Sequence, residues 1–174
     1  MNIAIVSYSL SGNNAALAAR TAQKLGARHI ALQPPKPLTI PAIVVQVLFN
    51  LTPKAQPAAE TLSAFDAVVL AGPVWMGMVA TPLRACLRWL RKNTKPYGYL
   101  TICGGADGPN PRIEAELRRA TGRKPDVLLV QHIRTLLPDE PKPTREDTSP
   151  YRLTDADVEK LATAAADAVR VGLA

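Results

Sequence analysis

The sequence predicts a single α/β domain over residues 1–174, built on a parallel sheet with helices on both faces. Five short apolar runs are continuous rather than alternating, which is typical of strands that are covered on both faces. Helical patterns separate these runs, as the crossover connections of a parallel sheet require. A hydrophobic content of 47% and a charged content of 20% are ordinary for a folded protein, so disorder is not the default expectation.

The predicted elements alternate in regular order. Strands are expected at 2–7, 28–32, 67–72, 98–103 and 127–133, and helices at 13–25, 80–93, 110–121 and 154–171. The last helix has the clearest start, because Thr154 can serve as its N-cap and Asp155 and Asp157 fall in its first turn.

Two segments depart from this alternation. Residues 34–57 contain six prolines around the apolar run 43–51, and no charged residue lies between Lys36 and Lys54. The run is too short to span a bilayer. A buried core helix between the second and third strands is the favoured interpretation; a lid over the site, a homodimer patch and a peripheral membrane contact are the alternatives. Residues 138–153 form a second, polar and proline-rich connection.

The net charge of +7 is concentrated in residues 84–124, which hold ten Lys or Arg and three acidic residues. Apolar residues of helix 80–93 share one face, and Arg84, Arg88 and Arg91 line the other. A solvated helix face is the ordinary explanation of such a run. An anionic cofactor, an acidic redox protein or an anionic membrane surface are the functional alternatives. Nucleic acid is not expected as a partner, because aromatic residues are nearly absent among these charges.

The first basic residues and the few Cys and His residues bear on the cellular compartment and on metal binding. No Lys or Arg precedes Arg20, so the basic start of a secretory signal peptide is missing and a cytoplasmic location is expected. Cys86 and Cys103 lack the spacing of metal ligands, and His29 and His132 lie in separate apolar stretches. Neither a metal site nor a disulfide framework is predicted.

The turn after the first strand carries the strongest functional signal. Its residues are Ser9, Leu10, Ser11, Gly12, Asn13 and Asn14, and a helix follows at once. Backbone N–H groups converge in such a turn, and the helix dipole favours an anion there. Neither a P-loop nor a G-x-G-x-x-G motif is present, and no basic residue lies between Tyr8 and Ala19, which favours a phosphate monoester. The alternative is that Ser11 and Asn13 only cap the helix.

Two further loops reach the same place in the predicted fold. With strand order 2-1-3-4-5, the loops after strands one, three and four meet where the strand order reverses. The loop after strand three contains Pro73, Val74, Trp75, Met76 and Gly77, and the loop after strand four contains Cys103, Gly104, Gly105, Ala106 and Asp107. A phosphate-binding turn, an aromatic side chain and a glycine-rich loop therefore converge on one crevice.

These loops resemble those of the flavodoxin-like family of FMN-binding proteins. Residues 9–14 are similar to the family's [S/T]-x-[S/T]-G-N-T phosphate loop, and residues 65–77 to its segment yD-x-v-v-l-G-x-P-v-W-x-G. The resemblance implies a three-layer α/β sandwich in which residues 9–14 hold the FMN phosphate. It also implies that residues 73–77 and 103–107 flank the flavin ring, with Trp75 as the side-chain contact.

The departures from the family pattern bear on function. Asn14 stands where the family has Thr, an aromatic residue is missing after strand four, and the chain is basic whereas small flavodoxins are acidic. These features favour an FMN-dependent oxidoreductase that passes electrons from NAD(P)H to a quinone or similar acceptor over a simple electron carrier. A carrier that docks to a redox protein, and a degenerate fold that no longer binds FMN, are the alternatives.

Overall fold

The computed structural model describes residues 1–105 and 111–174. Five parallel strands form the central sheet: β1 (Ile3–Ser7), β2 (Arg28–Ala31), β3 (Ala67–Ala71), β6 (Tyr97–Cys103) and β7 (Val127–His132). Their hydrogen-bonded order is β2-β1-β3-β6-β7. This numbering differs from the predicted 2-1-3-4-5 because two short strands, β4 (Val74–Trp75) and β5 (Met78–Val79), form a separate antiparallel hairpin between β3 and β6.

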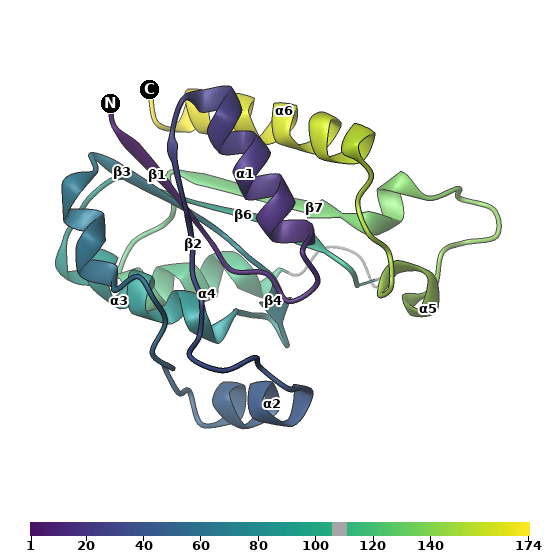
Figure 1. Ribbon diagram of the computed structural model, residues 1–174, viewed down its shortest axis with the longest axis horizontal. Helices are drawn as coiled ribbons and strands as arrows, with labels where there is room; N and C mark the ends of the chain where they lie inside the picture. The colour runs from purple at the N-terminus through teal and green to yellow at the C-terminus, as the bar shows by residue number, and fades with distance from the viewer. Residues whose placement is uncertain (106–110) are drawn as a thin grey trace.

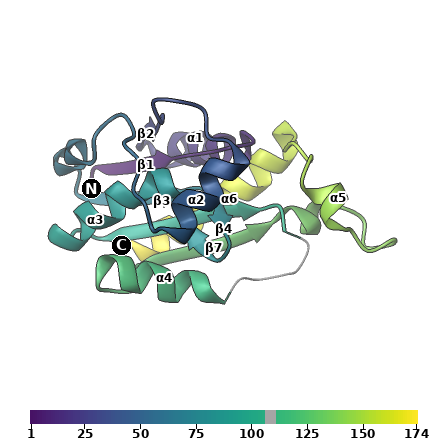
Figure 2. The same ribbon diagram turned by 90° about the horizontal axis from the view of Figure 1, so that it is seen from below.

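Helices cover both faces of the sheet, which gives three layers (Figures 1 and 2). The helices are α1 (Asn13–Leu25), α2 (Ile40–Leu48), α3 (Arg84–Lys92), α4 (Arg112–Thr121), α5 (Arg145–Thr148) and α6 (Asp155–Gly172). Helices α1 and α6 pack together on one face, and α3 and α4 pack together on the other. Helices α2 and α5 lie outside these layers.

The strands supply side chains alternately to two apolar cores. Ala4 and Val6 of β1 belong to the core beneath α3 and α4, whereas Ile5 between them belongs to the core beneath α1 and α6. Leu70 and Val69 of β3 divide in the same way. Successive strand residues point to opposite faces, so a strand buried on both faces must be apolar at every position. This is why the continuous apolar runs identified the sheet.

Capping side chains and proline determine where two of the helices begin. The capping box at Thr154 and Asp157 starts α6 as predicted, because the Thr154 hydroxyl accepts from the Asp157 N–H while the Asp157 carboxylate accepts from the Thr154 N–H. The predicted helix 80–93 is shorter: residues Thr81–Leu83 form a 3-10 turn around Pro82, and α3 begins at Arg84. Among the described residues, no helix combines the length and the apolar character needed to cross a bilayer.

The interpretation of 43–51 as a buried core helix is wrong. Thr39 caps helix α2 with its hydroxyl, Pro41 sits in the first turn, and the helix ends at Leu48. Only Ile43 and Val47 are buried. Most of its other apolar side chains are exposed, among them Leu48 at 70%, and the C-cap residue Phe49 is 72% exposed. The segment is a helix between β2 and β3, but it packs beside the sheet layers and leaves most of its apolar surface uncovered.

Candidate functional site

The carboxyl ends of β1, β3 and β6 lie side by side at one edge of the sheet. The loops that leave these ends are the three that the sequence singled out. The structure therefore brings the turn at 9–14, the hairpin at 73–77 and residues 103–105 to the same edge (Figure 1). Ala106 and Asp107, the last two predicted site residues, lie outside the described residues.

The turn after β1 presents polar groups toward solvent. Gly12 is the N-cap of α1 and takes a left-handed conformation with φ of 93°, which favours glycine. No side chain caps this helix, so the alternative role of Ser11 and Asn13 as caps is not realised. The Ser9 hydroxyl accepts from the Gly12 N–H at 3.0 Å, which shapes the turn. The first amides of α1 lack an intrahelical acceptor, and Ser9 and Ser11 are partly exposed beside them.

The side chains of Asn13 and Asn14 hold this turn in place. Asn14 is 3% exposed and makes two hydrogen bonds with the backbone of Ile102: its amide donates to the carbonyl oxygen at 3.1 Å and accepts from the N–H at 3.0 Å. Asn13 makes a similar pair, donating to the Tyr151 carbonyl and accepting from the Leu153 N–H. Both amides are thus engaged with backbone, and the groups left for a ligand are the N–H groups of the turn and the two serine hydroxyls.

The hairpin after β3 presents a rigid turn at the site. Met76 and Gly77 both have positive φ, 50° and 81°, as a two-residue type I′ hairpin turn requires. Trp75 is half-buried and packs edge-on against Tyr8, with ring centroids 5.8 Å apart. The side chain of Met76 is 58% exposed at the tip. Tyr8, which sequence reasoning did not select, orients Trp75 from the neighbouring strand end.

The loop after β6 is held from the C-terminal side. Thr148 of α5 is fully buried and donates a hydrogen bond from its hydroxyl to the Gly104 carbonyl. Gly105 has open space where a side chain would stand. Burial raises the pKa of the Cys103 thiol above its ordinary value, so this thiol stays protonated at neutral pH. The polar connection 138–153 therefore supports the site through α5 and Tyr151, a role that no local signal in the sequence reveals.

A pocket of about 620 Å³ opens beside the hairpin. Its walls come from three elements: Met76, Gly77 and Met78 of the hairpin, Val47 and Leu48 of α2, and Arg112, Ala115, Glu116 and Arg119 of α4, with Asn50 between them. The apolar segment 43–51 and the basic stretch 84–124, which are far apart in the sequence, thus meet at one opening. We refer to it as the hairpin pocket.

The place of Arg84 in helix 80–93 predicted a solvated position, and this prediction is wrong. It is 5% exposed and donates hydrogen bonds to the carbonyl oxygens of Gln46 and Leu51, at 3.2 and 2.9 Å. Burial lowers the pKa of its guanidinium, and Glu116 acts in the opposite direction. Arg84 therefore fastens the end of α2 to α3, whereas Arg88 and Arg91 are exposed as expected.

The residues at this sheet edge suit the phosphate and ring of FMN. The turn offers N–H groups and hydroxyls without an acidic side chain, and Gly12 and Gly105 leave open space. Trp75 and the positive-φ turn at Met76 and Gly77 present an aromatic ring and backbone near the same edge. Nothing in the described part of the site opposes the binding of a flavin mononucleotide.

No protein-family model matches the sequence, and no curated protein matches it. Solved structures do. A flavoprotein from Lactobacillus acidophilus, solved in complex with FMN, is similar with a TM-score of 0.58 at 15% identity, over 75% of this chain and 92% of that one. The Trp repressor binding protein from Bacillus subtilis has a TM-score of 0.55 at 15% identity, over 96% and 98%. The flavodoxin WrbA-like protein from Agrobacterium tumefaciens has a TM-score of 0.52 at 15% identity, over 99% and 98%. The chain therefore has the flavodoxin-like fold.

Proposed function

We propose that the protein is an FMN-dependent oxidoreductase that passes electrons from NAD(P)H to a quinone or similar apolar acceptor. The observation that carries this proposal is the hairpin pocket. It adjoins Met76 and Gly77, and it combines apolar side chains of α2 with arginines of α4. A simple electron carrier needs no such pocket.

In this proposal the turn after β1 binds the cofactor's phosphate. The hydroxyls of Ser9 and Ser11 and the N–H groups of residues 10, 11, 13 and 14 would donate to it, and the α1 dipole would add to the attraction. Trp75, Met76 and Gly77 on one side and residues 103–105 on the other orient the ring. When bound, FMN supplies the redox chemistry, and the protein supplies binding, orientation and exclusion of water.

The hairpin pocket receives the substrates. Its volume of about 620 Å³ lies within the usual range for small-molecule sites, which is roughly 300–1,000 Å³. Val47, Leu48 and Met78 provide apolar contact for a quinone-like ring. Arg112, Arg119 and Glu116, which is paired with Arg119, leave this lining with a net positive charge, and that charge favours the phosphates of a nicotinamide dinucleotide.

The first experiment is a visible absorbance spectrum of the purified protein, followed by titration with FMN if it is colourless. We expect a flavin spectrum and tight binding. Ser11→Ala should weaken FMN binding about tenfold, since it removes one hydrogen bond to a charged group. Ser63→Ala is the matched control, because Ser63 is an exposed serine in the segment that precedes β3. Failure to bind FMN at micromolar concentration would leave the chain as a fold without its cofactor and refute the proposal.

A loaded protein is then tested for oxidation of NADPH and NADH in the presence of a soluble quinone. Steady turnover supports the oxidoreductase. The second candidate is an electron carrier, which the exposed Arg88, Arg91 and Arg118 favour as a docking surface for an acidic protein. Slow oxidation of the nicotinamide, with fast and strongly salt-dependent reduction by a flavoprotein reductase, would select that candidate.

A further inference from the structure

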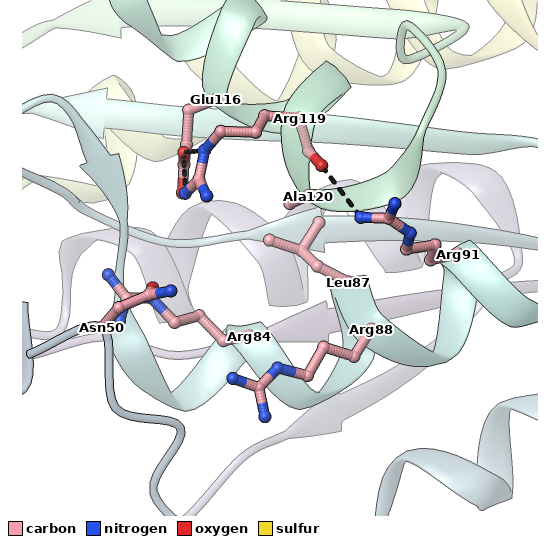
Figure 3. Close-up of a pocket in the computed structure, with 8 residues that line it drawn as sticks. All are labelled: Asn50, Arg84, Leu87, Arg88, Arg91, Glu116, Arg119 and Ala120. Atoms are coloured by element: carbon pink, nitrogen blue, oxygen red, sulfur yellow. Dashed lines mark hydrogen bonds and ion pairs between the residues drawn. The ribbon is translucent and has the colours of Figure 1, made fainter.

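A small pocket lies between α3 and α4 and adjoins the hairpin pocket, since Asn50, Glu116 and Arg119 line both. Its volume is about 180 Å³. Figure 3 shows Leu87 and Ala120 at its centre, with charged side chains of both helices around them. We refer to it as the arginine pocket.

Positive charge in the arginine pocket is not balanced by the residues that line it. Arg84, Arg88 and Arg91 come from α3 and Arg119 from α4, and Glu116 is the single acidic residue of the lining. The Glu116 carboxylate accepts two hydrogen bonds from Arg119, at 2.7 and 3.0 Å. Arg91 donates only to the Arg119 carbonyl, and Arg88 has no partner among the described residues. Arg88 and Arg91 therefore line the pocket without a carboxylate partner in the described part of the chain, and Arg84 lies beside them with its Nη1 bound to backbone carbonyls.

One donor of the arginine pocket is also buried without an acceptor. Arg84 is 5% exposed, and its Nη1 is satisfied by the carbonyl groups of Gln46 and Leu51. Its Nε is buried and has no hydrogen-bond partner in the described part of the chain. Buried donors in folded proteins are nearly always paired. An anionic ligand with oxygen acceptors would supply a hydrogen-bond acceptor for the Arg84 Nε and would balance the positive charge of Arg88 and Arg91.

We propose that the arginine pocket binds a phosphate group. Guanidinium groups match phosphate oxygens with paired donors, and several of them together favour a dianion over a carboxylate. The pocket is smaller than the usual site for a complete small molecule, which begins at roughly 300 Å³. It therefore takes the phosphate alone and leaves the remainder of the ligand outside.

Two kinds of ligand carry such a group. One is a small phosphate ester that is free in solution. The other is the 2′-phosphate of NADPH, whose remaining parts would extend into the adjoining hairpin pocket; this assignment rests on the proposed function. The phosphate-binding role is common to both, and it holds for the arginine pocket whichever ligand supplies the group.

The test is calorimetric titration of the full chain with inorganic phosphate at pH 8 and at constant ionic strength. We expect saturable binding that Arg88→Gln and Arg91→Gln each weaken about tenfold, the loss of one charge-assisted hydrogen bond. Arg118→Gln removes the same charge from an exposed position of α4 outside the pocket and should leave the affinity within about twofold, the level expected for a small change in a screened surface charge. Ser11→Ala should leave unchanged the part of the binding that Arg88→Gln and Arg91→Gln weaken, which separates this pocket from the turn after β1.

Absence of saturable binding, or an equal loss in Arg118→Gln, would overturn the proposal. Neither result depends on FMN, so a chain that fails to bind FMN can still pass this test, and a working oxidoreductase can fail it. KM values of the FMN-bound protein show whether the bound phosphate group belongs to NADPH or to a separate phosphate ester. A KM for NADPH raised about tenfold by Arg88→Gln, with an unchanged KM for NADH, identifies the dinucleotide. Phosphate binding without that difference identifies a separate phosphate ester.

Discussion

Asn14→Ala should destabilise the fold far more than a typical surface change. Strand β3 pairs with β6 only as far as Ala71 and Leu100, so Ile102 extends beyond the end of its neighbour. The Asn14 amide occupies the place of the missing strand and satisfies both the N–H and the C=O of Ile102. The alanine variant leaves these two buried groups without partners.

The size of the effect follows from that loss. A buried backbone group without a partner costs about 1–3 kcal/mol, so two of them cost about 2–6 kcal/mol. For a domain of this length, each kcal/mol lowers Tm by about 2–4 °C, which gives a decrease of roughly 4–24 °C. Asn14→Thr should lose an intermediate amount, because one hydroxyl can replace at most one of the two bonds.

The measurement is urea unfolding followed by circular dichroism, with Asn2→Ala as the control. The Asn2 amide donates to the Ala64 carbonyl at an exposed position, and its loss should cost no more than about 1 kcal/mol. If Asn14→Ala unfolds within about 1 kcal/mol of the parent chain, Asn14 does not act as the substitute strand described above.

Three further predictions concern other contacts. Gly72→Ala would place a Cβ 2.5 Å from Leu83 Cδ1 and 3.1 Å from the Tyr8 carbonyl oxygen, and the overpacking should lower the free energy of unfolding by about 1–3 kcal/mol in urea titrations. Arg84→Met should release the end of α2, and chymotrypsin should then cut at the exposed Phe49 faster than in the parent chain; an unchanged rate would contradict the anchoring role. Burial lowers the pKa of His132 below its ordinary value of 6.5, with Arg134 acting in the same direction, so the unfolded chain binds a proton at a higher pH than the folded chain. The free energy of unfolding should therefore fall as pH drops through about 6.5, and His132→Phe should weaken that dependence in unfolding curves at pH 7.5 and 5.5.

The sheet was predictable because its signal is local. A strand buried on both faces needs apolar residues at consecutive positions, and β1, β3, β6 and β7 all show such runs. The β4–β5 hairpin lacks this signal: each strand has two residues, and Met76 adopts positive φ without being a glycine. The single glycine at 77 did not distinguish a hairpin from an irregular loop.

The parts of the site that depend on distant partners could not be predicted. Asn14 bonds to a residue 88 positions away, and Asn13 to one 138 positions away. Their sequence context indicates a phosphate loop and contains nothing about these contacts. The prediction that helix α2 is buried was wrong for a related reason. An apolar segment is buried only when another element of the fold covers it. That covering surface is absent from the described part of the chain around Leu48 and Phe49.

The long reach of Asn13 has a consequence for the order in which the protein takes shape. Strand β1 and helix α1 are made well before Tyr151 and Leu153, but the start of α1 is fastened to the carbonyl of Tyr151 and the N–H of Leu153. At about 5 to 20 residues per second, the 138 residues between Asn13 and Tyr151 take roughly 7 to 28 s to synthesise. During that time the first turn of α1 lacks its anchor, so a ligand can be held firmly only after residues 151–153 have emerged from the ribosome.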